Sequence, residues 1–362
     1  MSVRRQTVVI ALAVIAAACN EPTGPVGDPL DMRQVVGTPL SNPDRVVQSH
    51  AVWSPDGQWV YYISSNQAGD LALSRAATDG SGSTIVDLGG ATLDTVSVLG
   101  PLSFVAASET GDLYVTAFNG STAQRGVLVL SDGNPPAWLP GIDDPAAIAL
   151  APGEDYLVYG VSVSESVTEA DLWSYSLSSG TSTHLTTGRP LAIASSGTGL
   201  LVAVEDTTYY GASLTNGSLQ RVDLGIGQDK PTAVRWGPTG IHVLFRLFNN
   251  DRVGYDYFVK HVNAGTTSLF YQESFADDGS EVLAWSPDGS QIAVWFQVCL
   301  VGTGVGSCDS FHSALYVINV STTVAGWVAG ARDAQIGLAS YSPDSKRVAY
   351  RVLGTLYLST VG

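Results

Sequence analysis

The sequence predicts an all-β protein, a single β-propeller of four-stranded antiparallel blades that follows an N-terminal signal peptide. Three observations predict it. A Ser-Pro-Asp turn motif recurs along the chain, and short runs rich in β-branched and aromatic residues flank the copies. The 39 glycines and the low charged fraction, 14%, suit many short strands joined by tight turns.

The N-terminal segment has the features of an export signal. Arg4 and Arg5 precede an apolar run, Thr7–Ala18, that is too short to span a bilayer as a helix. The run ends in three alanines before Cys19, a pattern that resembles the bacterial lipobox. This resemblance implies a signal peptide over residues 1–18 and lipidation of Cys19. An ordinary signal peptide with an incidental cysteine is the alternative.

Residues 19–44 are expected to be a Pro- and Gly-rich tether, and residues 45–362 the propeller. The stretch Glu21–Pro43 contains five prolines and almost no apolar periodicity. Asn20 follows the expected lipidated cysteine where an Asp would imply retention at the inner membrane. We therefore expect a lipid-anchored protein of the cell envelope, at the outer rather than the inner membrane, either facing the periplasm or exposed at the surface.

The turn motif has three clear copies and four weaker ones. The clear copies are Trp53–Gly57, Trp285–Gly289 and Tyr341–Ser345, the last with Ser in place of Gly. The weaker copies are Ser108–Gly111, Ala151–Glu154, Ser195–Thr198 and Trp236–Gly240. Successive copies are separated by about 42 to 56 residues, which is the period of propeller blades.

The composition of the motif predicts a type I turn between two strands. Ser supplies a side-chain acceptor, Pro a preset φ, and the last residue a backbone free to take positive φ. The strands expected around the copies and later in the repeats are Trp59–Ile63, Leu172–Leu177, Thr183–Leu185, Gln291–Phe296, Ala314–Val320, Arg347–Val352 and Thr355–Ser359. Four strands make one blade.

Division of the chain favours seven blades. Seven copies give about 45 residues per blade, whereas six blades, the alternative, need about 53. The last copy leaves only about three strands before Gly362. The ring is therefore expected to close with a strand from Arg33–Gln48, because closure removes free sheet edges.

These repeats resemble those of the TolB-type, WD-repeat-like propellers of bacterial envelopes. The resemblance covers about residues 48 to 362, and it implies the fold much more than the function. The chain departs from TolB in two ways: it lacks the α/β domain that precedes the TolB propeller, and it has a lipobox instead. TolB function is therefore not transferred to it.

Charge and motifs exclude several functions. The formal net charge is −16, from 33 acidic and 17 basic residues, and no basic cluster offsets it in the mature chain. Nucleic-acid binding is excluded on this ground, and membrane attachment needs the lipid. No G-x-S-x-G motif occurs, and no two of the five histidines stand at short ligand spacing. We expect no catalytic residue, no metal site and no cofactor.

Cys299 and Cys308 flank the Gly-rich sequence LVGTGVGS. A disulfide within this loop is the natural assignment in an exported protein. A thiol-redox site is the alternative, but it favours the closer C-x-x-C spacing.

Three long loops are predicted on one face of the ring: Val161–Ala170, Asn249–Asp256 and Val298–Ser313. Long loops on a rigid scaffold commonly carry recognition residues. The candidate partner-contacting residues there are Arg252, Tyr255, Tyr257, Phe311 and His312, since Arg and aromatic residues anchor interfaces. The alternative is that Tyr255 and Tyr257 only pack between blades.

The leading hypothesis is a monomeric, non-catalytic, lipid-anchored binding module that presents loops to protein or peptide partners in the envelope. On this hypothesis the protein is not an enzyme. The alternative is a glycan-binding protein or a glycan-active enzyme with a site at the central channel.

Overall fold

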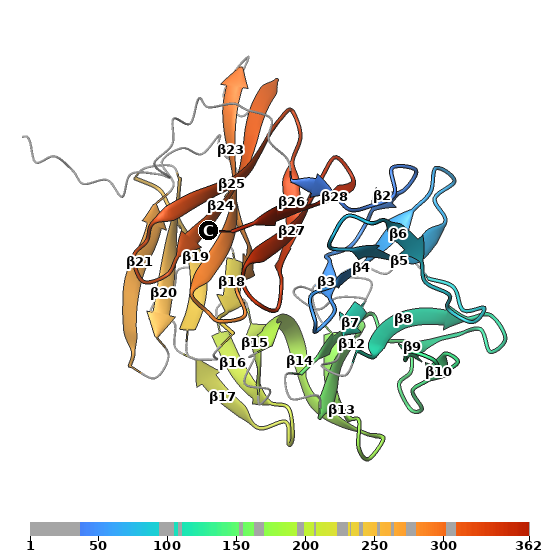
Figure 1. Ribbon diagram of the computed structural model, residues 1–362. Helices are drawn as coiled ribbons and strands as arrows, with labels where there is room; N and C mark the ends of the chain where they lie inside the picture. The colour runs from blue at the N-terminus through green and yellow to red at the C-terminus, as the bar shows by residue number, and fades with distance from the viewer. Residues whose placement is uncertain are drawn as a thin grey trace, which may run out of the picture.

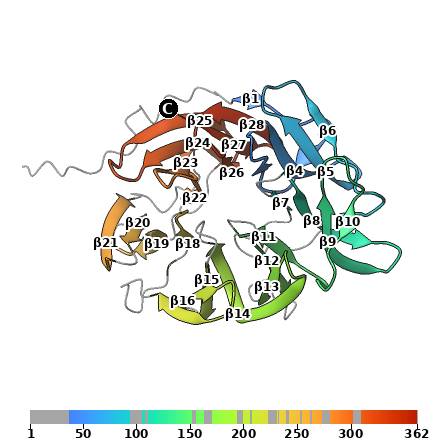
Figure 2. The same cartoon turned by 60° about the horizontal axis from the view of Figure 1, so that its bottom comes forward.

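The computed structural model describes residues 37–93, 105–107, 111–151, 155–162, 170–193, 199–205, 208–222, 231, 233–238, 242–251, 254–261, 264–272, 280–301 and 309–361. Every regular element among them is a β-strand, which confirms the all-β prediction. The strands form six antiparallel sheets around a central axis, the arrangement of a β-propeller (Figures 1 and 2). No helix in these ranges has the length and hydropathy that crossing a membrane requires.

We number the sheets around the ring. Sheet 1 contains β2 (Val46–Val47), β3 (Val52–Trp53), β4 (Trp59–Ser65), β5 (Leu71–Ala77) and β6 (Ser83–Ile85). Sheet 2 contains β7 (Val105–Ala107), β8 (Leu113–Asn119), β9 (Gln124–Leu130) and β10 (Ala137–Trp138). Sheet 3 contains β11 (Ala147–Leu150), β12 (Tyr156–Ser162), β13 (Ala170–Ser176), β14 (Thr181–Ile193), β15 (Gly199–Glu205), β16 (Thr208–Ser213) and β17 (Leu219–Val222).

The second half of the chain supplies three more sheets. Sheet 4 contains β18 (Ala233–Trp236), β19 (His242–Asn249), β20 (Gly254–His261) and β21 (Thr266–Gln272). Sheet 5 contains β22 (Ser280–Trp285), β23 (Gln291–Val301), β24 (Ser310–Asn319) and β25 (Ala325–Arg332). Sheet 6 contains β26 (Ile336–Tyr341), β27 (Arg347–Val352), β28 (Thr355–Thr360) and β1 (Thr38–Pro39).

The prediction of seven separate four-stranded blades is not met, because the described strands form six sheets and sheet 3 has seven strands. Its middle strand, β14, is shared. Thr181–Gly188 pair with β13, and Arg189–Ile193 pair with β15. No turn interrupts the chain between these two segments, so the outer strand of one four-stranded half continues as the inner strand of the next.

The Ser-Pro-Asp motif forms the predicted turn in all three clear copies. The backbone N–H of the fourth residue donates to the carbonyl of the first at 2.9 Å, as in Gly57 to Ser54 and Ser345 to Ser342. The fourth residue has positive φ, 68° at Gly57 and 60° at Ser345. The Ser54 hydroxyl also accepts the Trp59 N–H at 2.9 Å, so the motif closes the start of the following strand.

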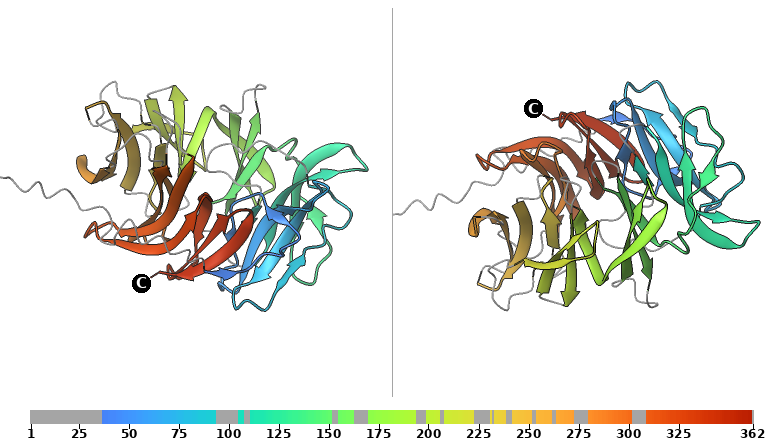
Figure 3. Two further views of the ribbon diagram at one scale, coloured as in Figure 1. Left: turned by 90° about the horizontal axis from the view of Figure 1, so that it is seen from above. Right: turned by 90° about the horizontal axis from the view of Figure 1, so that it is seen from below.

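The N-terminus closes the ring, as predicted. β1 pairs with the C-terminal strand β28, and the first described strands, in blue, lie beside the last ones, in red, in both views of Figure 3. The Gly37 N–H donates to the Tyr350 hydroxyl at 2.8 Å, which ties the incoming segment to sheet 6. The propeller therefore begins before residue 45, and the predicted tether boundary is corrected accordingly.

The core lies between neighbouring sheets rather than in one central cluster. Sheets 6 and 1 enclose Trp53, Tyr62, Val47 and Ala349. Sheets 5 and 6 enclose Trp295, Leu315 and Tyr350. This packing buries both faces of each sheet. Binding sites are therefore expected at the ends of the strands, which lie on the two faces of the ring.

Candidate functional site

The innermost strands surround the axis of the ring. β3, β7, β11, β14, β18, β22 and β26 are the first strands of the successive four-stranded units, and neighbours among them make contact at β3–β7, β7–β11, β14–β18 and β22–β26. Figure 2 shows them around the axis. The β4–β5, β19–β20, β23–β24 and β27–β28 connections lie on one face, which we call the hairpin face.

His50 lies on the inner edge of sheet 1, between β2 and β3. β2 and β3 both pair with β4, and His50 is in the irregular stretch between them. Ser49 anchors this stretch, because its hydroxyl accepts the Ile63 N–H at 2.9 Å and donates to the His50 carbonyl at 2.9 Å. Residues 48–51 between β2 and β3 are irregular, so the regular inner edge of sheet 1 is interrupted at His50.

The environment of His50 is electropositive. Its pKa is lowered from 6.5 to about 4 by desolvation, then by the charges of Arg235 and Arg351. The side chain nevertheless keeps an exposed surface. The desolvation and the exposed surface are compatible, because protein atoms can surround a side chain on several sides without covering it. His50 is therefore a neutral imidazole at neutral pH.

The two arginines whose charges lower the His50 pKa come from different sheets. Arg351, in β27 of sheet 6, donates from Nη1 to the Val47 carbonyl at 3.3 Å, which places its guanidinium beside the inner edge of sheet 1. Arg235 is in β18, the innermost strand of sheet 4, which does not adjoin sheet 1 in the ring (Figure 2). Its effect on His50 therefore acts across the centre of the ring.

The central cluster of His50, Arg235 and Arg351 fits an anion. Two guanidinium groups provide fixed donors for a carboxylate, and the neutral imidazole adds one donor and one acceptor. In the described part of the chain, no three His, Cys, Asp or Glu side chains gather as a metal site. The two positive charges of the cluster contrast with the protein as a whole, which is strongly acidic, with a formal net charge of −16.

The residues predicted to contact a partner do not form one exposed surface. Tyr257 is 1% exposed and packs in the core between sheets 4 and 5, and His312 is 5% exposed in β24. Burial removes these two side chains from a recognition surface, as the packing alternative anticipated for Tyr257. Tyr255 and Phe311 are partly exposed, and Arg252 lies outside the described residues.

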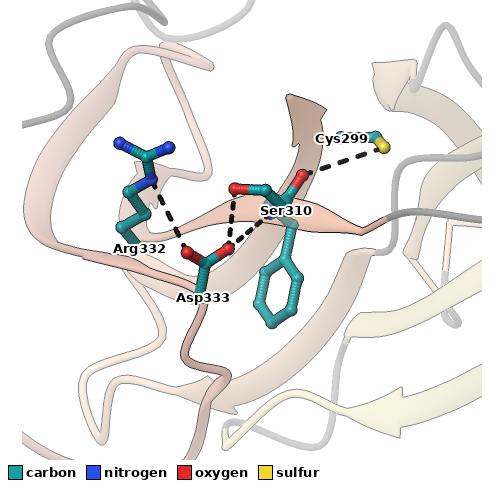
Figure 4. A network of polar contacts seen from close by, with 5 residues as sticks. Cys299, Ser310, Arg332 and Asp333 are labelled. Carbon is teal, nitrogen blue, oxygen red and sulfur yellow. Dashed lines mark hydrogen bonds and ion pairs between the residues drawn. The ribbon is translucent and has the colours of Figure 1, made fainter. Parts of the chain in front are cut away.

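Phe311 is the second residue of β24, and its neighbour Ser310 lies beside Asp333 (Figure 4). The Asp333 Oδ1 accepts the Phe311 N–H at 3.0 Å and the Ser310 hydroxyl at 2.8 Å. These hydrogen bonds, led by that of Ser310, hold the pKa of Asp333 below its ordinary value. The carboxylate thus joins the start of β24 to the end of β25.

Cys299, in β23, lies on the other side of this network. Its Sγ is 3.9 Å from the Ser310 carbonyl oxygen (Figure 4). Cys308 lies outside the described residues, as does Cys19. The pairing of Cys299 with Cys308 and the lipidation of Cys19 remain predictions.

Sequence reasoning missed all three residues of the central cluster. His50, Arg235 and Arg351 are far apart in the chain and belong to no motif. His50 was considered only as one of the five histidines, and no role was assigned to Arg235 or Arg351. A sequence feature that points to His50 is its position just before the first clear turn motif, where the innermost strand of a blade begins.

Comparison with known proteins shows the fold. No family model and no curated protein matches the chain. Among solved structures, an oligogalacturonate lyase in complex with manganese is similar, with a TM-score of 0.64 and 13% identity over 91% of this chain and 96% of that one. An oligogalacturonate lyase from Vibrio parahaemolyticus has a TM-score of 0.62 and 10% identity over the same shares. TolB from Acinetobacter baumannii has a TM-score of 0.45 and 13% identity over 84% of this chain and 76% of that one.

These matches correct the expectation that the protein is not an enzyme. Nearly the whole of the chain shares its fold with two lyases. The absence of catalytic sequence motifs therefore does not indicate a non-catalytic module, because a propeller can gather a site from separate blades. At 13% and 10% identity, what the chain and the lyases are shown to share is the propeller fold.

Proposed function

We propose that this protein is a glycan-active enzyme that binds an acidic saccharide at the centre of the ring. The observation that carries the proposal is the central cluster, in which Arg235 and Arg351 act on His50 from two different sheets. Two cations at the axis of an acidic protein favour a ligand that carries carboxylates. The fold shared with oligogalacturonate lyases supports the same class of ligand.

The cluster has the groups that an elimination beside a carboxylate needs. Arg235 and Arg351 balance the uronate charge and the further negative charge that develops when the adjacent C–H bond is broken. His50, neutral at neutral pH, accepts that proton on a ring nitrogen. The C–H electron pair forms a C=C double bond, the glycosidic C–O bond breaks, and the departing oxygen takes a proton from water.

Manganese, which is present in one of the similar lyases, does not fit the described residues. No three side chains of the ligating types gather among them. The charges of Arg235 and Arg351 also act on His50, and they oppose a divalent cation at that side chain. The proposed reaction includes no step that uses a metal.

Binding and turnover of oligogalacturonate test the proposal. Titration calorimetry with the full chain measures binding, and the ultraviolet absorbance of an unsaturated product measures elimination. Arg235→Gln and Arg351→Gln should each weaken binding by about tenfold or more, because each removes charge-assisted hydrogen bonds. The matched control is Arg221→Gln, since Arg221 is exposed on the outermost strand of sheet 3.

A neutral oligosaccharide of equal length provides the second control. The proposal requires that the wild type bind oligogalacturonate more tightly than the neutral chain, and that His50→Ala reduce product formation more than binding. Equal affinity for both saccharides, or unchanged binding in both arginine variants, would overturn it.

We also propose the finer organisation of the chain. The two halves of sheet 3 count as separate blades that share β14, which makes a ring of seven. The apolar segment Thr7–Ala18 and Cys19 support export and lipid anchoring in the cell envelope. Mass spectrometry of the native protein tests the anchor, because lipidation leaves Cys19 as a modified N-terminus.

A further inference from the structure

The β19–β20 hairpin carries an aromatic cluster on the hairpin face. Phe248 is 43% exposed, and its ring meets that of Tyr255 edge to face with centroids 5.3 Å apart. The Arg246 guanidinium lies 4.2 Å from the centre of the Tyr255 ring. We call Phe248, Tyr255 and Arg246 the outer cluster.

The outer cluster is held rigidly from below. The Arg246 Nη1 lies 3.4 Å from the Tyr257 hydroxyl, and Tyr257 is fixed in the core between sheets 4 and 5. The Phe248 ring rests against Tyr255 and presents a large apolar surface to solvent. Rigid exposed aromatic side chains lose little entropy on binding, which makes them effective recognition groups.

Sheet register connects the outer cluster to the central cluster. Arg235 is in β18, the innermost strand, and pairs with Leu244 of β19. Arg246 is two residues further along β19, and Tyr255 is on the next strand, β20, opposite Phe248. The path from Arg235 to this pair covers roughly 10 Å across the strands and roughly 13 Å along them.

His50 and the outer cluster lie toward the hairpin face of the ring, whereas Arg235 lies near the other end of sheet 4, beside the β18–β19 connection. His50 precedes β3, the innermost strand of sheet 1, and so lies at the end of that strand away from the Ser-Pro-Asp turn at Ser54–Gly57. The β19–β20 connection lies at the corresponding end of sheet 4. A chain molecule that runs from Arg235 along sheet 4 toward the β19–β20 hairpin therefore passes Arg246 before Phe248.

We infer that the outer cluster is a second subsite, which stacks the distal sugar residues of the saccharide whose carboxylate is bound at the centre. The inference rests on the proposed function. A pyranose ring offers a face of C–H bonds to the electron-rich face of an aromatic ring, and Phe248 supplies that ring. Arg246 carries positive charge outward along the same path. The ligand is thus an oligosaccharide of several residues rather than a mono- or disaccharide.

The dependence of affinity on chain length tests this subsite. Dissociation constants of digalacturonate and hexagalacturonate are measured by calorimetry for the wild type and for Phe248→Ala. The variant should bind the hexamer about tenfold more weakly, while its affinity for the dimer stays within about twofold of the wild type. Phe248→Trp should restore binding of the hexamer, because it restores an aromatic face.

A matched control is Leu269→Ala, since Leu269 is 44% exposed on the outermost strand of the same sheet. It should bind both saccharides as the wild type does. Wild-type protein that binds the hexamer no more tightly than the dimer, or a Phe248→Ala variant with unchanged hexamer affinity, overturns the subsite and leaves the central site standing. A wild type that binds neither saccharide overturns the proposed function and the subsite together.

Discussion

The Nη2 of Arg347 donates a hydrogen bond of 2.9 Å to the carbonyl oxygen of Gly57, 290 residues away in the sequence. Gly57 ends the first copy of the turn motif, and Arg347 begins the strand after the last copy. The Nη1 of the same side chain reaches the Thr78 hydroxyl at 3.1 Å, and the guanidinium lies 5.3 Å from the centre of the Trp53 ring. One side chain thus fastens the last blade to the first.

Arg347→Met should lower the free energy of unfolding by about 1.5 to 3 kcal/mol, because it removes charged hydrogen bonds to Gly57 and Thr78. Equilibrium urea unfolding measures the change. Lys346→Met is the matched control, since Lys346 is exposed beside it. If both variants unfold at the same urea concentration as the wild type, Arg347 does not stabilise the closure.

Gly37→Ala should destabilise the closure of the ring at the pairing of β1 with β28. A Cβ atom at Gly37 would lie 1.9 Å from the Leu358 carbonyl oxygen, too close for any side chain, so β1 must shift from its place. We expect a loss of about 1 to 3 kcal/mol. Gly120→Ala is the control, because a Cβ there meets no atom within 4 Å. Equal midpoints of thermal unfolding for the two variants would contradict this account.

The turn motif should make stability depend on acid. The Ser342 hydroxyl is the main cause that lowers the pKa of Asp344 below 3.8. The folded state therefore favours the carboxylate, and this contribution is present above about pH 4 and is lost as the pH falls through the folded pKa. Asp344→Asn should remove this dependence. Urea unfolding from about pH 5 to about pH 2 checks it, and identical acid profiles of the variant and the wild type would show that Asp344 contributes nothing.

The His50 imidazole should titrate with a pKa of about 4. Because the folded pKa is below the ordinary 6.5, its contribution to stability is full above about pH 6.5 and is lost as the pH falls toward about 4. NMR titration of the histidine side chains measures the value. Arg235→Gln and Arg351→Gln should each raise it, whereas Arg221→Gln should leave it unchanged. A His50 pKa near 6.5 in the wild type would contradict the central cluster, because it would show that burial and the two arginines do not lower the pKa.

Cys299→Ser and Cys308→Ser should each lower the free energy of unfolding by about 2 to 3 kcal/mol, the amount expected for a disulfide that closes a short loop. The double variant should lose no more than either single one, because one bond is removed in all three. Non-reducing peptide mass mapping identifies the bond directly. Two free thiols in the native protein would contradict the pairing.

Strands and turns were predicted from the sequence with good accuracy because they depend on neighbours in the chain. The predicted segment Arg347–Val352 coincides with β27, and Trp59–Ile63 falls within β4. The motif that closes at Ser342 needs only residues up to Arg347. The exception is β14, where Thr183–Leu185 is only part of a 13-residue strand, because local propensity does not reveal where a strand changes partners.

The sequence by itself determined the repeat, the turn geometry, the closure by an N-terminal strand and the all-β class, since periodic apolar residues and short-range hydrogen bonds encode all four. Only the tertiary structure decided which distant side chains act on one another. His50, Arg235 and Arg351 come from three sheets, and their mutual electrostatics arise from the ring as a whole. Burial of Tyr257 and His312 was decided in the same way, because a strand pattern does not show how closely the next sheet packs against it.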